Sequence, residues 1–276
     1  MEMITSNKNE KIKNLQALLK LKKERDRQGV FVIEGLRIFK DTLETVPRFI
    51  EEIFISESFA SGSFMNELRV GVSINSELRL NEKITVVRDS IFSSISQTVT
   101  PQGIMCIVKK PVHKIEEITE MLSEGSDNEH MKILLLENIQ DPGNLGTMLR
   151  TAEAAGVAGI VMSRDCADIF NPKVVRSTMG SVFRVPFIYA EDFCAAVEHL
   201  KENGITIYAA YLHGGVRYTE IHYDRKSAVM IGNEGNGLTD EAVEKADKRL
   251  YIPMEGKIES LNAAVAAAIL LYHDMR

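Results

Sequence analysis

The sequence has little cysteine and no long apolar run. Its three cysteines, Cys106, Cys166 and Cys194, are too few and too widely spaced for a disulfide framework or a CxxC metal site. We therefore expect buried, reduced thiols. No apolar run approaches the roughly 20 residues that span a bilayer, and residues 1–14 lack the apolar region of a secretory signal. These absences favour a cytoplasmic protein without a membrane anchor.

Two common chemical signatures are also missing. No GxxxxGK[ST] or GxGxxG pattern follows a predicted strand, which argues against a nucleotide-hydrolysing enzyme. The six histidines form no cluster with cysteines or carboxylates at metal-ligand spacing, so no metal is predicted. The 45% of hydrophobic and 26% of charged residues are typical of a globular protein and exclude collagen-like and low-complexity chains. A length of 276 residues fits one large domain or, more readily, two.

Positive charge is scarce overall but concentrated near the start of the sequence. The net charge of −6 argues at first against a nucleic-acid partner. Residues 8–27 nevertheless carry +5, which leaves −11 for the rest of the chain. Apolar residues recur there at near-helical intervals: Ile12, Leu15, Leu18, Leu19 and Leu21. The stretch therefore predicts one amphipathic helix with a basic face, which either faces solvent or contacts RNA.

Strands and helices alternate along the rest of the chain. Before residue 110, apolar strands are predicted at 30–35, 51–56, 83–88 and 103–110, with helices at 36–44 and from Asp89. An acidic stretch, 111–130, ends in a Gly/Ser/Asp/Asn cluster typical of a linker. Further strands are predicted at 132–137, 158–163, 184–189, 206–211, 227–232 and 249–253, before a final helix from Ser260. The almost continuous apolar run at 132–137 indicates a parallel sheet covered on both faces, and hence an α/β fold.

Three segments stand out where strands of the second half end, which is where α/β sheets bind ligands. Residues 137–157 (ENIQDPGNLGTMLRTAEAAGV) place Asn144 and Arg150 after a Pro-Gly turn, and residues 231–238 (IGNEGNGL) surround Glu234. Residues 252–273 (IPMEGKIESLNAAVAAAILLYH) carry Ser260, Leu261 and Asn262 before an Ala-rich helix.

Each segment also has a purely structural interpretation. Residues 141–144 have the composition of a turn and helix N-cap, and Ser260 has that of an N-cap. The glycines at 232, 235 and 237 suit positive φ angles.

Together, in this order and at these spacings, the three segments closely resemble the signature motifs of the SpoU (TrmH) family of RNA ribose 2'-O-methyltransferases, which belong to the SPOUT class. The segment 176–186 (RSTMGSVFRVP) resembles the family's sequence between the first and second motifs. Residues 30–44 and 100–110 resemble the L30e-like substrate-binding domain of its ribosomal-RNA branch. The resemblance implies an L30e-like α/β domain at 1–110, a linker at 111–130, and a catalytic domain at 131–276 with a mostly parallel sheet and a deep trefoil knot.

The resemblance also implies a cofactor and a set of site residues. S-adenosyl-L-methionine would bind in the knot, and two subunits would pack as a homodimer to complete the active sites. Gly232, Ile252 and Leu261 would make backbone contacts to the cofactor. The catalytic positions would be Arg150, Asn144, Glu234, Ser260 and Asn262.

Arg150 is the residue expected to act most directly. A guanidinium is not deprotonated in proteins, so a buried bidentate clamp on the phosphate of the reacting nucleotide is a sounder role than general base. Glu234 would orient Arg150 or another polar group, while Ser260 and Asn262 would order the acceptor ribose.

Structured ribosomal RNA is the expected substrate. The basic leading segment and Arg37 would grip its phosphates. DNA should be no substrate because it lacks the 2'-hydroxyl. Methylation of transfer RNA or of a base, and a non-catalytic RNA-binding module, are the alternatives.

Overall fold

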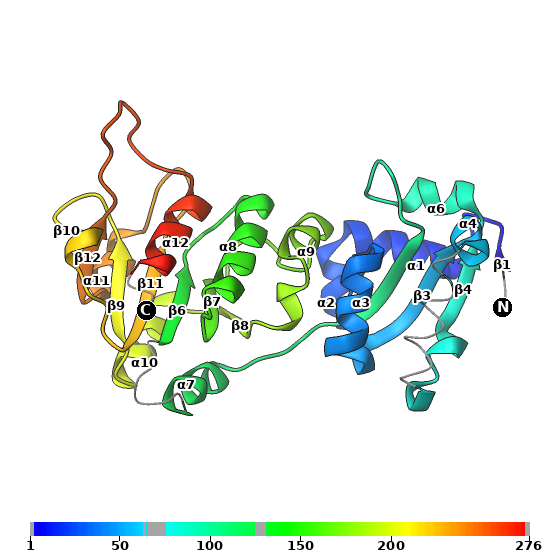
Figure 1. Cartoon of the computed structure of the whole chain (residues 1–276), viewed down its shortest axis with the longest axis horizontal. Coiled ribbons are helices and arrows are strands. Elements are labelled where there is room, and N and C mark those ends of the chain that lie inside the picture. Colours follow the sequence, from blue (N-terminus) through cyan, green and yellow to red (C-terminus); the bar gives the residue numbers. More distant parts are fainter. Residues whose placement is uncertain (1–2, 63–64, 66–75, 125–130, 274–276) are drawn as a thin grey trace. The chain divides into compact units, whose positions relative to one another are not determined.

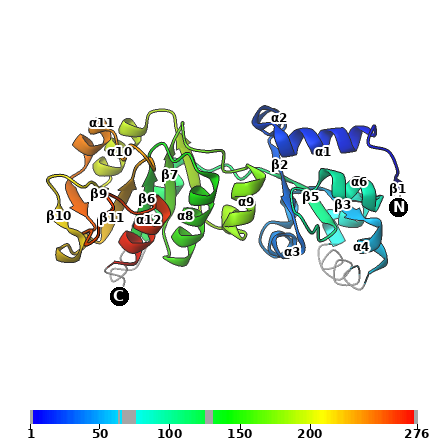
Figure 2. The same cartoon turned by 90° about the horizontal axis from the view of Figure 1, so that it is seen from above.

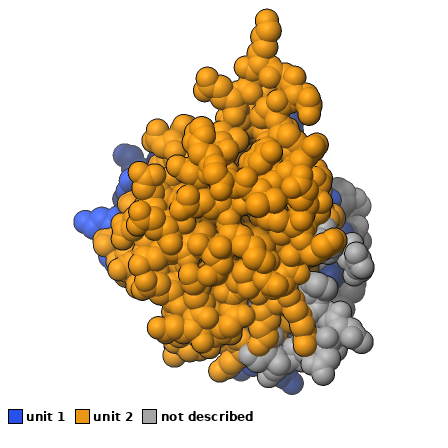
Figure 3. All heavy atoms as spheres, turned by 90° about the vertical axis from the view of Figure 1, so that its left-hand side faces the viewer, with its two compact units in different colours: residues 1–111, 170–183 blue, residues 112–169, 184–276 orange. Residues whose placement is uncertain are grey.

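The computed structural model describes residues 3–62, 65, 76–124 and 131–273, so the Gly/Ser-rich end of the expected linker lies outside the described residues. The chain forms two compact units, coloured separately in Figure 3. Unit 1 comprises residues 1–111 and 170–183, and unit 2 comprises residues 112–169 and 184–276.

Unit 1 is built on a five-stranded mixed sheet with the strand order β1-β4-β3-β5-β2 (Figure 1). Strand β5 runs antiparallel to both of its neighbours, while β1, β4 and β3 are parallel to one another. Its elements up to residue 111 are β1 (Met3–Ile4), α1 (Glu10–Lys20), α2 (Lys22–Gln28), β2 (Val30–Glu34), α3 (Leu36–Thr45), η1 (Pro47–Phe49), β3 (Ile50–Ser56), α4 (Glu57–Ser61), η2 (Ser76–Leu78), η3 (Leu80–Lys83), β4 (Ile84–Val87), α6 (Asp89–Ile95) and β5 (Ile104–Lys109). The expected strands and helices of this half are all present.

The basic leading segment differs from the single helix that we expected. It forms two helices, because Leu21 adopts an extended backbone between them and is 53% exposed. Arg25 is 2% exposed and donates a hydrogen bond from Nη1 to the carbonyl of Leu18 at 2.6 Å, where α1 runs out of partners within the helix. Ile12, Leu15, Leu18 and Leu19 pack as predicted against the sheet and α6. Because of this break, Leu21 is exposed although it was predicted on the apolar face, and Arg25 is buried although it was predicted on the basic face.

Residues 170–183 complete unit 1 with α9 (Pro172–Thr178) and η4 (Ser181–Phe183). The ring of Phe31 on β2 lies 4.8 Å from that of Phe170 and 5.7 Å from that of Phe183, measured between centroids. The ammonium of Lys110 lies 4.7 Å from the centre of the Phe170 ring. Aromatic packing and a cation–π contact thus join this distant segment to β2.

Unit 2 is built on a seven-stranded sheet in the order β10-β12-β9-β11-β6-β7-β8, in which every described strand pair is parallel. Its elements are α7 (Ile115–Glu124), β6 (Met131–Leu136), α8 (Pro142–Ala154), β7 (Gly159–Ser163), β8 (Phe187–Ala190), α10 (Phe193–Glu202), β9 (Thr206–Ala210), β10 (Val216–Arg217), η5 (Tyr218–Glu220), β11 (Lys226–Ile231), α11 (Asp240–Lys245), β12 (Lys248–Tyr251) and α12 (Ala263–Tyr272). The mostly parallel α/β sheet was predicted from the apolar run that forms β6.

Helices cover both faces of this sheet. Figures 1 and 2 show α8 and α12 side by side on one face and α10 and α11 on the other. The core beneath α10 and α11 also takes in Ile118 of α7, a helix within the segment expected to be a linker. None of the described helices is long and apolar enough to cross a membrane. The cysteines are free, with Cys106 and Cys166 buried as expected and Cys194 half-buried.

The far end of α12 is fixed by a buried cation. Lys132 on β6 is 3% exposed, and its ammonium donates hydrogen bonds to the carbonyls of Leu271 (2.9 Å) and His273 (2.7 Å). The hydroxyl of Tyr223 donates to the carbonyl of Leu270 at 3.1 Å. A positive charge at the carboxyl end of a helix is favourable, so Lys132 holds α12 in place along its axis.

Candidate active site

Two of the three predicted loops leave the sheet from adjacent parallel strands. Strands β6 and β11 pair from Met131–Lys226 to Leu136–Ile231, and the amide of Glu137 extends the ladder by donating to the carbonyl of Ile231 at 2.9 Å. The loop after β6 enters α8, and the loop after β11 enters α11. Because both loops start at the same sheet edge, residues 94 positions apart in sequence come into hydrogen-bond contact.

The carboxylate of Glu234 joins these two loops. It accepts hydrogen bonds from the amides of Gln140 (3.1 Å) and Asp141 (3.0 Å) and from Nδ2 of Asn144 (3.0 Å). Burial raises the pKa of Glu234, but the hydrogen bonds from Asn144 and the two amides outweigh it and leave the pKa below its ordinary value. Glu234 is therefore charged at neutral pH, and its carboxylate anchors the loop after β6 to the loop after β11.

The third loop joins the same cluster through Asn262. Its Nδ2 donates to Oδ1 of Asn144 at 2.9 Å, while its own Oδ1 accepts from the amides of Ala264 (3.0 Å) and Val265 (3.2 Å) as the N-cap of α12. Asn144 thus links Glu234 to Asn262. The structural interpretation of Ser260 as the N-cap is wrong, since Asn262 takes that place; Asp141, by contrast, caps α8 as its composition indicated.

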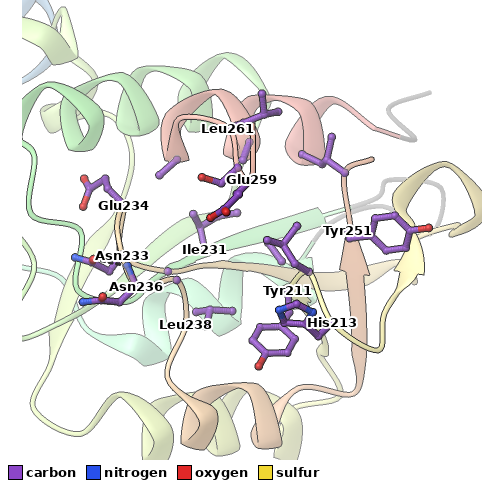
Figure 4. A pocket seen from close by; sticks show the side chains of 18 of the residues that line it. Tyr211, His213, Ile231, Asn233, Glu234, Asn236, Leu238, Tyr251, Glu259 and Leu261 are labelled. Carbon is purple, nitrogen blue, oxygen red and sulfur yellow. Dashed lines mark hydrogen bonds between the residues drawn. The ribbon is translucent and has the colours of Figure 1, made fainter. Parts of the chain in front are cut away.

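A cavity of about 440 Å³ lies beside this cluster, and Figure 4 shows its lining side chains. Gly232, Ile252 and Leu261, the three predicted cofactor contacts, all line it. A Cβ on Gly232 would lie 2.2 Å from the backbone carbon of Gly237, so no side chain fits there. The amides and carbonyls of Asn233 and Gly237 exchange two hydrogen bonds of 2.9 Å, which close the turn tightly over Gly232.

A second, more open pocket of about 610 Å³ shares part of this wall. It is lined by Gln140, Asp141, Pro142, Asn144, Glu234, Ser260, Leu261, Asn262 and Ala263. Ser260 lines both hollows, is exposed, and makes no hydrogen bond with any other described residue. Its hydroxyl is therefore available to a ligand that extends from one hollow into the other.

Arg150 is the predicted residue that the structure does not bring into the cluster. It lies on α8 six residues beyond Asn144, which turns it about 120° away around the helix axis. The prediction that Arg150 is buried is wrong: it is exposed, and its side chain makes no hydrogen bond or ion pair with the other described residues. Its neighbours Leu149 and Met148 take the buried face of α8 instead.

Several residues that support the site were missed. The carboxylate of Glu137, 6% exposed, accepts hydrogen bonds from the amide (2.8 Å) and hydroxyl (2.7 Å) of Thr239, the N-cap of α11. Asn138 has a φ of 55°, and its carbonyl accepts from Nδ2 of Asn233 at 2.7 Å. Asn is the residue other than glycine that tolerates this backbone best. Polar residues directly after an apolar strand were the signal that could have revealed both.

The comparisons with known proteins agree with this geometry. Residues 131–272 match the model of the SpoU rRNA Methylase family, and residues 9–106 match that of the MRM3-like substrate binding domain. The chain is 36% identical over 273 residues to the 23S rRNA (guanosine(2553)-2'-O)-methyltransferase RlmP of Bacillus subtilis, with 99% of each chain covered.

Solved structures of similar fold cover almost the whole chain. The AdoMet-bound rRNA methyltransferase from Sinorhizobium meliloti has a TM-score of 0.81 at 28% identity, over 99% of this chain and 97% of that one. The SpoU methyltransferase AviRb from Streptomyces viridochromogenes, in complex with AdoMet, reaches 0.81 at 23% identity, over 97% of both chains, a likeness of fold alone. The expected α/β fold is thus confirmed, and the chain belongs to the SpoU rRNA methylase family.

Proposed function

We propose that the chain transfers the methyl group of S-adenosylmethionine to a ribose 2'-hydroxyl of ribosomal RNA. The observation that carries this proposal is the convergence of three loops, through Glu234, Asn144 and Asn262, on an open pocket that shares Glu234 and Ser260 with the neighbouring cavity. The membership in the SpoU family and the activity named for the Bacillus subtilis relative support it.

The smaller cavity fits S-adenosylmethionine in size and chemistry. A volume of about 440 Å³ is in the range of small-molecule sites, and apolar side chains such as Ile231 and Leu250 line it beside polar groups. Gly232 lacks a side chain so that Gly237 can close the turn against it, and the turn forms part of the cavity lining together with Ile252 and Leu261. The cofactor would supply an electrophilic methyl group there.

The polar residues would then position the acceptor nucleotide. Glu234 is saturated by three donors and fixes the amide of Asn144, which in turn fixes that of Asn262. The open pocket would take the ribose, with the Ser260 hydroxyl as a hydrogen-bond partner for it. Holding the 2'-hydroxyl in line with the methyl group accounts for much of the catalysis, because a displacement requires that alignment.

Arg150 lies outside the cluster of Glu234, Asn144 and Asn262. It would bind a phosphate in a site that a second copy of the chain completes.

Helix α12 is apolar throughout, yet Val265 and Tyr272 are 48% and 50% exposed. Exposed apolar side chains beside the site are typical of an interface, so we propose a homodimer across α12. Light scattering of the wild type and of Val265→Asp tests this, since a monomeric wild type would contradict it.

Each predicted domain would have its own role in the reaction. Residues 1–110 would bind RNA, 111–130 would link, and 131–276 would catalyse, in the cytoplasm where ribosomal RNA is found. The match of residues 9–106 to a substrate-binding model supports the first of these roles.

One experiment separates the proposed reaction from its alternatives. Unmodified ribosomal RNA and, separately, unmodified transfer RNA are incubated with S-adenosylmethionine radiolabelled in its methyl group, and the labelled RNA is compared with the same RNA carrying a 2'-deoxyribose at the labelled nucleotide. Label on the ribose that vanishes with the 2'-deoxy substitution is expected. Label on a base, label only on transfer RNA, or no label would each reject the proposal in favour of one named alternative.

A further inference from the structure

The loop of residues 96–102 in unit 1 carries an apolar side chain with nothing packed against it. The loop connects α6 to β5 and has the sequence SQTVTPQ. Val99 at its tip is 101% exposed, and the residues next to it, Thr98 and Thr100, are polar. A valine in this position adds nothing to the core. It is available to a partner.

This loop is held in one conformation at its first half. The carboxylate of Glu34, at the end of β2, accepts hydrogen bonds from the hydroxyl of Ser96, the amide of Gln97 (3.1 Å) and the hydroxyl of Thr98 (2.9 Å). From the other side, Nη1 of Arg176 on α9 donates to the carbonyl of Gln97 at 2.7 Å. Strand β2 and helix α9 of unit 1 therefore fix the backbone before Val99.

The last residue of the loop is held in place as well. Oε1 of Gln102 accepts from the amide of Leu36 at 2.8 Å, which ties the loop to the first turn of α3. A loop that is already ordered loses little conformational entropy when a partner binds. The exposed valine is thus presented rather than left on a flexible tip.

Two exposed cations lie on α3 and α9, the helices that contact the loop. Arg37 follows Leu36 and is exposed, and Lys173 lies three residues before Arg176, on the same face of α9, and is also exposed. A protein partner would be expected to cover a larger apolar patch than one valine. A nucleic acid fits better, because an apolar side chain can wedge against a base while arginine and lysine take the phosphates.

We propose that loop 96–102 reads an unpaired base of the RNA substrate. Val99 packs against the face of that base, and Arg37 and Lys173 bind the neighbouring phosphates. The inference rests on the proposed function, because it assigns part of the recognition of the same RNA to a defined loop of unit 1.

The test compares Val99→Ser with a matched variant, Val112→Ser. Val112 is 83% exposed and lies outside this loop. Affinity for a ribosomal RNA fragment is measured by fluorescence anisotropy over a series of salt concentrations. Val99→Ser is expected to weaken binding about five- to tenfold, with an unchanged dependence on salt. Arg37→Gln should weaken it with a salt slope lowered by about one. Val112→Ser should bind like the wild type.

A double variant tests the role of Glu34 as a positioning residue. Glu34→Ala frees the loop and should weaken RNA binding to a similar degree, and combining it with Val99→Ser should add little further loss. Additive losses would contradict the idea that Glu34 acts through Val99. Calorimetric affinity for S-adenosylmethionine and the midpoint of thermal unfolding check that each variant is folded.

The outcomes separate this inference from the proposed function. If the wild type methylates RNA and Val99→Ser binds it like Val112→Ser, the inference fails and the proposed function stands. If the wild type neither binds nor methylates RNA, both fail. A changed salt slope in Val99→Ser would also overturn the inference, because a valine contacts no phosphate through charge.

Discussion

Glu34 in unit 1 and Glu234 in unit 2 both hold a loop through hydrogen bonds to their carboxylates, but the two loops face different surroundings. Glu34 ends a strand and Glu234 follows one, and each carboxylate accepts three hydrogen bonds from a distant segment of its own unit. Glu234 draws its loop inward, onto the wall of a cavity, whereas Glu34 holds a loop whose tip faces outward. In both units the carboxylate fixes the conformation of a loop, and the side chains on that loop decide what it can bind.

The largest effect is expected at the glycine that shapes the inward loop. Gly232→Ala would place a Cβ 2.2 Å from the backbone of Gly237 and force the turn open. We expect at least about a hundredfold loss of affinity for S-adenosylmethionine by calorimetry, because the cavity wall itself must move. Gly235→Ala is the control, since its Cβ would meet only Oδ1 of Asn233 at an ordinary 3.6 Å. Equal losses in both variants would show that the close approach at Gly232 does not matter.

A smaller but clearer contrast is expected between the two anchors themselves. Glu234→Gln leaves one of three donors without its acceptor, so kcat at saturating RNA should fall about ten- to a hundredfold. Glu34→Gln should instead raise KM for RNA, because its loop contacts only the substrate. Steady-state kinetics with both substrates varied separates the two. If both variants change kcat, or both change KM for RNA, the proposed difference between the two anchors is wrong.

The smallest effect concerns stability and pH. The pKa of Glu234 is lowered in the folded protein, so its charge stabilises the fold above the pKa of an unfolded glutamate, and that contribution is lost as the pH falls through the folded value. The difference in free energy of unfolding between the wild type and Glu234→Gln should therefore shrink from pH 6 to pH 3. Urea titrations at each pH measure it, and other carboxylates cancel because both proteins contain them. A constant difference would show that the hydrogen bonds act without the charge.

Much of the fold could be predicted from local pattern. The apolar run at 132–137 indicated a strand covered on both faces, and β6 is the strand between β11 and β7 with helices on either side. The leading segment was harder. The helical spacing of Leu15, Leu18 and Leu19 was right, but spacing alone says nothing about the break at Leu21, where Arg25 folds back onto the carbonyl of Leu18.

The site could be predicted only in part, because spacing along the sequence does not show which side chains meet. Motif order pointed to Asn144, Glu234 and Asn262, and the parallel pairing of β6 with β11 brings the first two together. Sequence order does not reveal which of these groups touch. Glu234 was expected to orient Arg150 or another polar group, and it holds Asn144 while Arg150 faces outward.

The α/β class, the strands, the family resemblance and the loops that carry the chemistry can be predicted from the sequence, because periodicity and motif spacing are local properties of the chain. Three features follow only from the folded chain: the buried ammonium of Lys132 holds α12, Gly232 lies against Gly237, and Glu34 and Arg176 hold the loop that carries Val99. These contacts join residues far apart in sequence or depend on exact backbone paths. Their energies come from packing and hydrogen bonding that exist only once the chain has folded.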